Sequence, residues 1–425
     1  MLASPGARAD RSLPASSVPA TGTWLDHRIG ALARRRVLDG LAGWREGRLT
    51  VTMPDGASVV LGAPAAEPHA SVWIDNDRFF RRVLLHGDMG AGDAYVDGDW
   101  RADDLALVID LAFRNQQHAP LDSILTRLSN LADAWRHRRR KNTTAGSRRN
   151  IYAHYDLGNE FFSLFLDPTM AYSSAVFVAP SDTLEAAQIE KYRQWGERLA
   201  PRACDHVLEI GSGWGGLAMH LARTYGCRVT SITVSEEQRA LATARVAAAG
   251  LAHLVDIELR DYRHIEGRYS RIVSVEMIEA VGREFWPDFF RAIDRALAPG
   301  GRVGLQAITM PDSRFDGYVR RSDWIQKHIF PGGLLPCLRE ISAVTAGHTQ
   351  LGVTHVEDRP LDYARTLRAW RTAFMARVDE VRRMGFDERF IRTWEYYFAS
   401  CEAGFRTRNL GLLHVTLARV GDDLV

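Results

Sequence analysis

The residues best suited to chemistry form a glycine-rich turn between an apolar run and an amphipathic run, in VLEIGSGWGG (207–216). Glycine lets the backbone turn sharply and lets a ligand approach main-chain amides that side chains would obstruct. Glu209 stands near the carboxyl end of the apolar run. The turn has the spacing G-x-G-x-G, at Gly211, Gly213 and Gly215. It predicts a site for a polar ligand at the end of a strand.

The next apolar run, VTSITV (229–234), narrows the class of ligand. Polar residues, among them Thr233 and Gln238, follow its end, and it lacks the single acidic residue that binds ribose in a dinucleotide site. With Glu209, this pattern is similar to the S-adenosylmethionine (AdoMet) site of class I methyltransferases. A nucleotide-dependent dehydrogenase and a purely structural turn are the alternatives, because dinucleotide enzymes carry a similar glycine-rich turn.

Strands and helices alternate from residue 150 onward, which predicts an α/β domain with a doubly wound, Rossmann-like sheet. The parallel strands are predicted at 207–210, 229–234, 255–259, 271–276 and 302–308. Helical spacing of apolar residues predicts helices at 217–226 and 236–250. The last strands of a seven-stranded sheet, partly antiparallel, are predicted at 352–358 and 412–420. Ligands of such sheets bind at the carboxyl ends of the strands.

A chain of 425 residues is too long for one ordinary core, so two domains are expected. We expect a disordered terminus at 1–20, a smaller α+β domain at 21–120, a basic linker at 121–149 and the catalytic domain at 150–425. In the smaller domain a β-hairpin is predicted from 48–53 and 58–62, and helices around 77–87 and 105–113. We interpret three of its residues as a packing corner: Tyr95, Asp97 and Trp100.

Composition excludes several classes of function. A formal net charge of +2 gives no global field that would attract nucleic acid. The chain contains no apolar run of about 18 residues that would span a membrane. Its four cysteines lack paired spacing, which argues against a disulfide framework or a zinc site and favours a reducing cytoplasm. The basic residues between 136 and 149 form either a solvated linker or a segment attracted to anionic lipid headgroups.

Five longer segments occur in a characteristic order: AHYDLGNEFFSLFLDPTMAYSSAVF (153–177), LEIGSGWGG (208–216), DYRHIEGRYSRIVSVEMIEAVG (261–282), HIFPGGLLP (328–336) and AGFRTRNLGLLHV (403–415). With these segments the chain resembles the cyclopropane-fatty-acyl-phospholipid synthases and their methyl-branching relatives. The resemblance covers nearly the whole chain after residue 25. It implies an enzyme that uses AdoMet to methylate the cis double bond of acyl chains in membrane phospholipids.

The resemblance also implies which residues line the AdoMet pocket. Tyr172 and Ser173 would form a lid, Thr233 and Gln238 would meet the ribose hydroxyls, and Asp261 would accept from the adenine amine. The alternative for Thr233 is an ordinary strand residue, and the alternative for Asp261 is a helix cap. The full set is Tyr172, Ser173, Glu209, Gly211, Gly213, Gly215, Thr233, Gln238, Asp261 and Tyr262.

The implied reaction is electrophilic: an alkene attacks the sulfonium methyl, and the site must exclude water, stabilise positive charge and remove one proton. In the family a bound bicarbonate is the base, held by a cysteine, a glutamate, a histidine, a tyrosine and backbone; no metal is implied. Glu279 and Tyr363 match the glutamate and the tyrosine, although an exposed acid at a turn is the alternative for Glu279. Ser174 stands at the position of the family's cysteine, and Gln306 stands at the position of its histidine. Ile308 is the residue implied for the backbone contact.

The chain departs from the synthase pattern at Ser174, Gln306 and Ala280, where synthases carry a cysteine and two histidines. Serine and glutamine still hydrogen-bond a small anion, but they cannot supply the charge of an imidazolium. The pattern EMIEA…LQAIT resembles that of the subgroup that deprotonates a neighbouring carbon. Such enzymes give a methylene-branched chain, which a separate reductase saturates. A cyclopropane product remains the alternative.

The implied partners are phospholipid and an anionic membrane surface, with the protein peripheral on the inner, cytoplasmic face and no nucleic acid bound. The oligomeric state does not follow from the sequence, although a homodimer would present two basic faces to a bilayer. Two other functions remain as alternatives. One is methylation of another small hydrophobic substrate, and the other is a non-catalytic lipid- or AdoMet-binding protein, motivated by Ser174 and Gln306.

Overall fold

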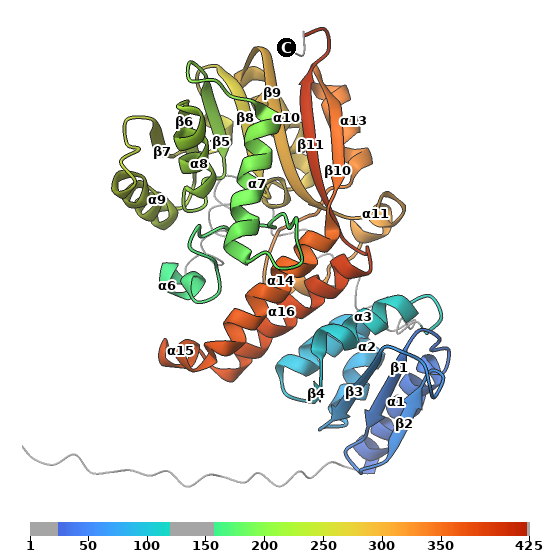
Figure 1. Ribbon diagram of the computed structural model, residues 1–425. Coiled ribbons are helices and arrows are strands. Elements are labelled where there is room, and N and C mark those ends of the chain that lie inside the picture. The colour runs from blue at the N-terminus through green and yellow to red at the C-terminus, as the bar shows by residue number, and fades with distance from the viewer. Residues whose placement is uncertain (1–23, 120–156, 423–425) are drawn as a thin grey trace, which may run out of the picture.

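The computed structural model describes residues 24–119 and 157–422. These residues form a large α/β unit and a smaller α+β unit, each built on its own sheet (Figure 1). The terminus at 1–20 and the basic linker at 121–149 lie outside the described residues. No helix in the described part of the chain is both long and apolar enough to cross a bilayer.

The larger sheet has seven strands in the order β10-β11-β9-β8-β5-β6-β7. Neighbouring strands from β7 to β9 pair in parallel, whereas β11 is antiparallel to both β9 and β10. The predicted doubly wound sheet with its late antiparallel strand is therefore confirmed. The strands are β5 (His206–Ile210), β6 (Arg228–Thr233), β7 (Val255–Leu259), β8 (Tyr269–Val275), β9 (Leu297–Thr309), β10 (Leu351–Asp358) and β11 (Gly411–Arg419).

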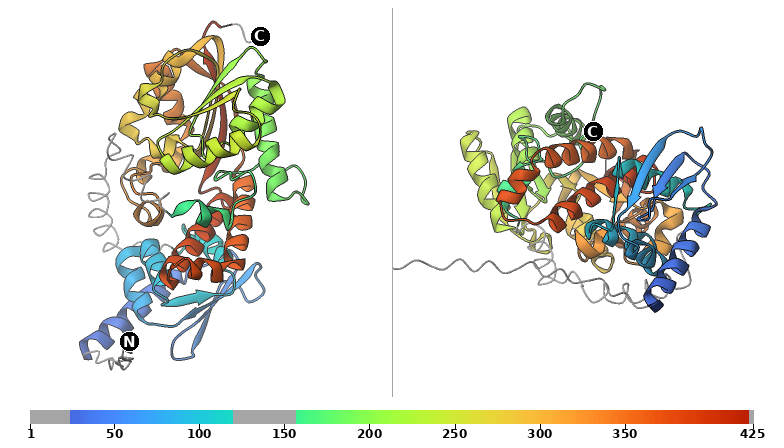
Figure 2. Two further views of the ribbon diagram at one scale, coloured as in Figure 1. Left: turned by 90° about the vertical axis from the view of Figure 1, so that its left-hand side faces the viewer. Right: turned by 90° about the horizontal axis from the view of Figure 1, so that it is seen from below.

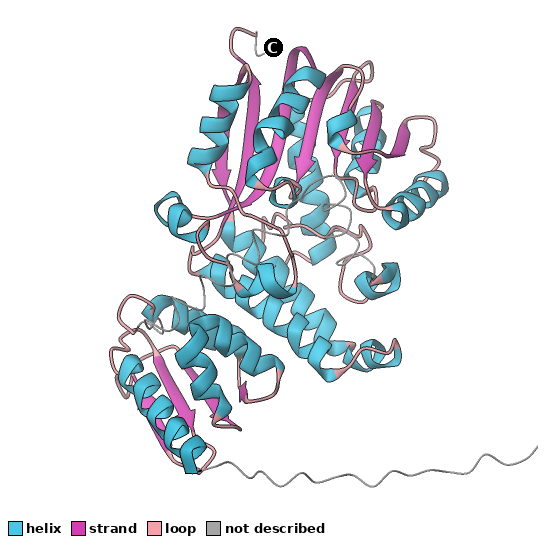
Figure 3. Ribbon diagram, turned by 180° about the vertical axis from the view of Figure 1, so that it is seen from behind, coloured by secondary structure: helices cyan, strands magenta, loops and turns pink. Residues whose placement is uncertain are grey.

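Helices cover both faces of this sheet, as Figure 3 shows, and each face has its own apolar core. One face packs against α7 (Leu184–Leu199), α8 (Gly216–Tyr225) and α9 (Glu236–Ala248). The other packs against α10 (Trp286–Ala296) and α13 (Leu338–His348). Because both faces are covered, β5, β8 and residues 303–309 of β9 are almost continuously buried, as is typical of parallel sheets.

The smaller sheet has the order β2-β1-β3-β4. β1 and β2 form the predicted antiparallel hairpin, and β3 adds to β1 in parallel. The second helix extends well beyond its predicted end at residue 87, because the chain resumes a helix after a break at Gly87, whose φ is 59°. The elements are α1 (Trp24–Leu41), β1 (Arg48–Thr52), β2 (Ser58–Leu61), β3 (His69–Ile74), α2 (Arg78–Val96), β4 (Trp100–Ala102) and α3 (Leu105–Asn115).

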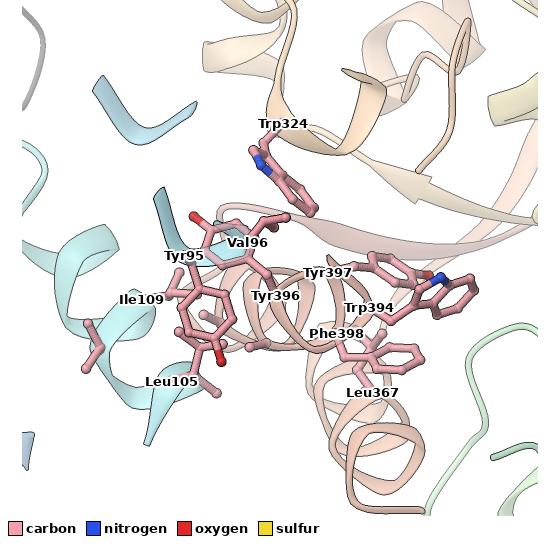
Figure 4. Close-up of a cluster of buried hydrophobic side chains, with 14 of the residues drawn as sticks. Tyr95, Val96, Leu105, Ile109, Trp324, Leu367, Trp394, Tyr396, Tyr397 and Phe398 are labelled. Atoms are coloured by element: carbon pink, nitrogen blue, oxygen red, sulfur yellow. The ribbon is translucent and has the colours of Figure 1, made fainter. Parts of the chain in front are cut away.

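Two long helices inserted between β10 and β11 join the two units: α14 (Pro360–Ala376) and α16 (Glu388–Arg406). They lie between the large sheet and the smaller unit (Figures 1 and 2). Figure 4 shows side chains of α2 and α3 meeting aromatic side chains of α16. Tyr95 and Trp100 are buried with ring centroids 5.1 Å apart, and the Tyr95 hydroxyl donates to Glu395 at 2.6 Å. Tyr95, Asp97 and Trp100 thus form a packing corner, in which Asp97 pairs with Arg82.

Short helices complete the described chain: α6 (Gly158–Ser163), η1 (Tyr262–His264), η2 (Ile278–Ala280), η3 (Arg283–Phe285), α11 (Asp312–Tyr318), α12 (Trp324–His328) and α15 (Val378–Arg383). Two of them follow strands at the carboxyl edge of the large sheet: η1 after β7 and η2 after β8. Because parallel strands end at the same edge, this edge gathers the turns that can hold a ligand.

Candidate active site

The glycine-rich turn joins β5 to α8 and has the backbone that its sequence predicts. Gly211, Gly213 and Gly215 have φ values of 98°, 47° and 81°, a region that side chains rarely adopt. The amides of Gly211 and Ser212 both donate to the carbonyl of Ile232 at 3.0 Å, which ties the turn to the end of β6. A Cβ built on Gly213 would meet no atom within 4 Å, so this glycine faces open space.

A pocket opens at this turn, at the carboxyl ends of β5, β6 and β8. Eight of the ten residues predicted to hold AdoMet line it: Tyr172, Ser173, Glu209, Gly211, Gly213, Thr233, Gln238 and Tyr262. At the end of β6 the Thr233 hydroxyl donates to Oε1 of Gln238 at 2.8 Å, so these two side chains form a polar pair. A glycine cradle beside a polar pair suits a nucleoside with an amino-acid tail, and the residues therefore fit AdoMet.

Two of the predicted residues do not line the pocket. Gly215 is the N-cap of α8. Asp261 is the N-cap of η1, accepts from the amide of Arg263 at 3.0 Å and is 6% exposed. This is the helix-cap alternative considered for Asp261, and its neighbours Arg260 and Tyr262 line the pocket instead.

The pocket also contains a buried cation that the sequence reasoning missed. Lys191 on α7 is 1% exposed and donates from Nζ to the hydroxyl of Ser173 at 2.6 Å. Burial lowers the pKa of Lys191 to about 8, while the nearby carboxylate of Glu276 acts in the opposite direction. A signal existed in the sequence, because Ala187 and Trp195 stand four residues to either side of Lys191 and place it on the apolar face of its helix.

Glu209 is 3% exposed at the end of β5 and accepts a hydrogen bond from the hydroxyl of Ser231. Burial raises the pKa of Glu209 to about 8. The carboxyl group is therefore largely protonated at neutral pH and can donate to a ligand as well as accept from it.

Three of the five residues predicted to hold a bicarbonate ion contact a side chain that was not predicted, Glu276. Its Oε1 accepts from the amide of Ser174 at 2.9 Å and from Nε2 of Gln306 at 2.7 Å. Its Oε2 accepts from the hydroxyl of Tyr363 at 2.7 Å. Glu276 is partly exposed and lines the AdoMet pocket, whereas its three donors belong to buried residues.

The backbone of Glu276 is also unusual, with a φ of 50° just after the end of β8. The conformation directs the chain into η2 while the amide of Glu276 donates to the carbonyl of Gln306 at 2.8 Å. Removal from bulk water raises the pKa of Glu276, and the three donors together with the ammonium group of Lys191 act in the opposite direction. A sequence signal for Glu276 was its position: an acid directly after a buried strand next to the glycine-rich one.

Glu279 lies one turn further on, in η2. Its Oε1 accepts from the amide of Ile308 at 2.6 Å, and its carbonyl accepts from the amide of Leu334 at 2.9 Å. Its Oε2 is buried and has no hydrogen-bond partner among the described residues. Burial, and then the charge of Glu276, raise the pKa of Glu279 to about 8. The amide of Ile308 thus contacts Glu279 directly, whereas Glu279 does not bond Tyr363, Gln306 or Ser174.

A cluster of aromatic rings begins at Tyr363, the residue that donates to Glu276. Tyr363 stacks on Phe405 with centroids 4.5 Å apart, and the hydroxyl groups of Tyr172 and Tyr397 lie 3.1 Å apart. Aromatic faces attract cations, and they exclude water. No group of three or more potential metal-binding side chains occurs in the residues that the structure describes.

The sheet order and the glycine-turn pocket at its carboxyl edge define a class I AdoMet-dependent methyltransferase. Residues 142–415 match the family described as mycolic acid cyclopropane synthetase. The chain belongs to this family, and AdoMet is its cofactor.

Relatives extend over most of the chain. A tuberculostearic acid methyltransferase of Mycobacterium tuberculosis is 42% identical over 370 residues, covering 84% of this chain and 85% of that protein. The cyclopropane-fatty-acyl-phospholipid synthase of Escherichia coli is 36% identical over 354 residues, covering 82% of this chain and 88% of that protein. The solved structure of a cyclopropane synthase of M. tuberculosis has a TM-score of 0.60 at 28% identity and covers 64% of this chain and 98% of its own. A mycolic acid cyclopropane synthase solved with SAH and CTAB has a TM-score of 0.59 at the same identity, covering 64% and 97%.

Proposed function

We propose that this enzyme transfers a methyl group from AdoMet to the cis double bond of an unsaturated acyl chain in a membrane phospholipid. The product is a cyclopropane or a methylene-branched chain, and a reductase partner would saturate the latter to a methyl branch. The observation that carries the proposal is a pocket whose lining fits the methyl donor, with buried polar groups and aromatic rings beside it. Formation of a ring or a methylene branch requires that the carbocation lose one proton to a base beside this pocket.

The residues present have distinct tasks in this reaction. AdoMet, when bound, supplies an electrophilic methyl group. Gly211 and Gly213 would leave room for its methionine portion, and Thr233 with Gln238 would bind the ribose hydroxyls. Tyr172 and Ser173 would close over the ligand and help to exclude water. The aromatic rings near Tyr363 would steady positive charge on the acyl chain.

A lipid substrate is supported by the relatives, whose names refer to fatty acyl and mycolic acid chains. We further propose that the enzyme is peripheral and touches the inner, anionic face of the membrane. Support comes from the sequence between 136 and 149, which holds seven basic residues: Arg136, Arg138, Arg139, Arg140, Lys141, Arg148 and Arg149. A homodimer, which would double this basic surface, is part of the same proposal.

One experiment tests the reaction. Purified protein is incubated with vesicles of oleoyl phospholipid and methyl-labelled AdoMet, and the fatty acids are released and analysed by mass spectrometry. We expect labelled carbon in the acyl chain, and the fragmentation pattern separates a ring from a methylene branch. Saturated vesicles are the control, because they lack the double bond. The absence of label from oleoyl lipid would contradict the proposed function.

A further inference from the structure

The family's bicarbonate base does not fit the residues of this chain. Three donors at the positions that would bind it are the backbone amide of Ser174, the side-chain amide of Gln306 and the hydroxyl of Tyr363. All three donate to the carboxylate of Glu276 instead, at 2.7 to 2.9 Å. The fourth, the amide of Ile308, donates to Glu279. A free anion would therefore compete with two side-chain carboxylates for these four donors, while the hydroxyl of Ser174 donates to the carbonyl of Ala175 at 3.0 Å.

The carboxylate of Glu276 has the chemistry that these donors require. Carboxylate and bicarbonate share a planar O–C–O group that accepts hydrogen bonds at both oxygens. In Glu276 both oxygens accept: Oε1 accepts two bonds and Oε2 accepts one. Gln306 is oriented for this contact, because its Oε1 accepts from the indole of Trp195 at 3.2 Å and leaves Nε2 to donate.

The backbone gives an independent indication that Glu276 is held for function. A φ of 50° is uncommon for a residue with a side chain and strains the backbone there. Glycine adopts the same φ without strain. A glutamate kept in this strained conformation, with its carboxylate in the wall of the pocket, indicates a functional role for that side chain.

We propose that the carboxylate of Glu276 replaces bicarbonate and is itself the proton acceptor of the reaction. This inference rests on the proposed function and adds the identity of its base. The neighbouring carboxyl group of Glu279 then serves as the neutral member of the pair. Two adjacent carboxyl groups do not readily ionise together, and the three donors favour charge on Glu276.

The step balances without a further reactant. The π electrons of the acyl double bond form a carbon–carbon bond to the methyl carbon, while the sulfur–carbon bond breaks with its electron pair left on sulfur. Positive charge then lies on the acyl chain. A C–H proton passes to a carboxylate oxygen of Glu276, and the electrons of that C–H bond close the ring or form a new double bond. The carboxylic acid afterwards returns its proton to water.

The first test uses the unaltered full-length protein. Label transfer to oleoyl vesicles is measured in buffer freed of carbon dioxide and in the same buffer with added bicarbonate. We expect the two rates to agree within twofold. A rate that falls more than tenfold without bicarbonate would overturn the inference alone. A protein that labels no lipid in either buffer would overturn the proposed function and the inference with it.

The second test uses two variants of the base. Glu276→Gln keeps the shape of the side chain, and we expect at least a hundredfold loss of turnover with AdoMet affinity unchanged by calorimetry. Glu276→Gly removes the side chain where φ already suits glycine, and we expect it to be inactive until bicarbonate or formate is added, which restores activity at least tenfold. Rescue is a readout that a purely structural role would not give.

Glu388→Gln is the matched control, because Glu388 is exposed and paired with Arg382 far from the pocket. We expect its turnover to remain normal and to be insensitive to added anions. Near-normal turnover of Glu276→Gln would overturn the inference. So would a Glu276→Gly protein that binds AdoMet normally and that neither bicarbonate nor formate restores.

Discussion

Tyr363 and Glu276 stand 87 positions apart in the chain and are joined by a hydrogen bond of 2.7 Å, in which the phenol donates to Oε2 of the carboxylate. Glu276 follows β8 in the middle of the large sheet, whereas Tyr363 belongs to α14, a helix inserted between the last two strands. The inserted helix therefore completes the acid–base site. The ring of Tyr363 stacks on Phe405 of α16, and this contact holds the Tyr363 ring in place.

Removal of that hydroxyl in Tyr363→Phe is expected to lower turnover about 10- to 100-fold, since a hydrogen bond to a charged group contributes about 1.5–3 kcal/mol. The bond from Tyr363 lowers the pKa of Glu276, so its loss raises that pKa. The acidic limb of the pH–rate profile should then move to higher pH. Ser174, Lys191, Gln306 and Glu279, which also face this carboxylate, are unchanged in the variant.

The matched control for Tyr363→Phe is Tyr95→Phe. Tyr95 also donates to a carboxylate, that of Glu395 at 2.6 Å, but at the junction of the two units. We expect Tyr95→Phe to lower thermal stability and leave the pH–rate profile in place. Equal shifts of the profile in both variants would contradict a specific role for Tyr363.

Glu279 should make the protein less stable as the pH rises. The pKa of Glu279 is raised from 4.5 to about 8 in the folded state, so the folded protein holds a proton there that the unfolded chain releases. The stability from this group is complete below pH 4.5 and is lost as the pH rises towards 8, at up to about 1.4 kcal/mol per pH unit. In Glu279→Gln the part of the pH dependence of stability that comes from residue 279 should disappear. Urea denaturation at pH 5, 6.5 and 8 measures the difference.

Glu388→Gln serves again as the control for this measurement, because an exposed carboxylate should leave the slope unchanged. Glu209 carries a similar upward shift of its pKa and is present in all three proteins, so the comparison isolates Glu279. If the free energy of unfolding changes equally with pH in the wild type and in Glu279→Gln, Glu279 is ionised in the folded state.

Gly213→Ala should weaken AdoMet binding at least tenfold. The substitution places a methyl group in the open space at the pocket wall and imposes strain at a φ of 47°. Gly250→Ala is the matched control, because Gly250 also has a positive φ, 70°, and open space around its Cβ, but lies after α9 outside the pocket lining. Both variants should lose about 1 kcal/mol of stability. Isothermal calorimetry should register lower affinity in Gly213→Ala alone.

The basic segment provides a test of membrane contact. Replacement of Arg138, Arg139, Arg140 and Lys141 by glutamine should reduce binding to anionic vesicles at least tenfold, since each charge near such a surface contributes about 1 kcal/mol. Binding to zwitterionic vesicles and affinity for AdoMet should stay the same. Undiminished flotation with anionic vesicles would remove membrane contact from the function of this segment.

Much of the fold followed from the sequence because the relevant signals are local. A period of two residues marked the hairpin of β1 and β2, and continuous apolar runs marked the parallel strands. The glycine-rich turn was predictable since only glycine tolerates φ values of 47° to 98° without strain. The length of α2 was wrong, because tertiary packing overrode the glycines after Gly87, and β9 begins five residues before its predicted start.

The sequence by itself determined the class of sheet, the turn that receives the methyl donor and most of the residues around it. The tertiary structure alone decided which carboxylate receives the hydrogen bonds of Ser174, Gln306 and Tyr363. Those donors come from a loop, a central strand and an inserted helix, and no periodicity connects them. Side chains distant in the chain meet only after long-range packing. The spacing of residues therefore could not show whether Glu276 or Glu279, one helical turn later, receives these hydrogen bonds.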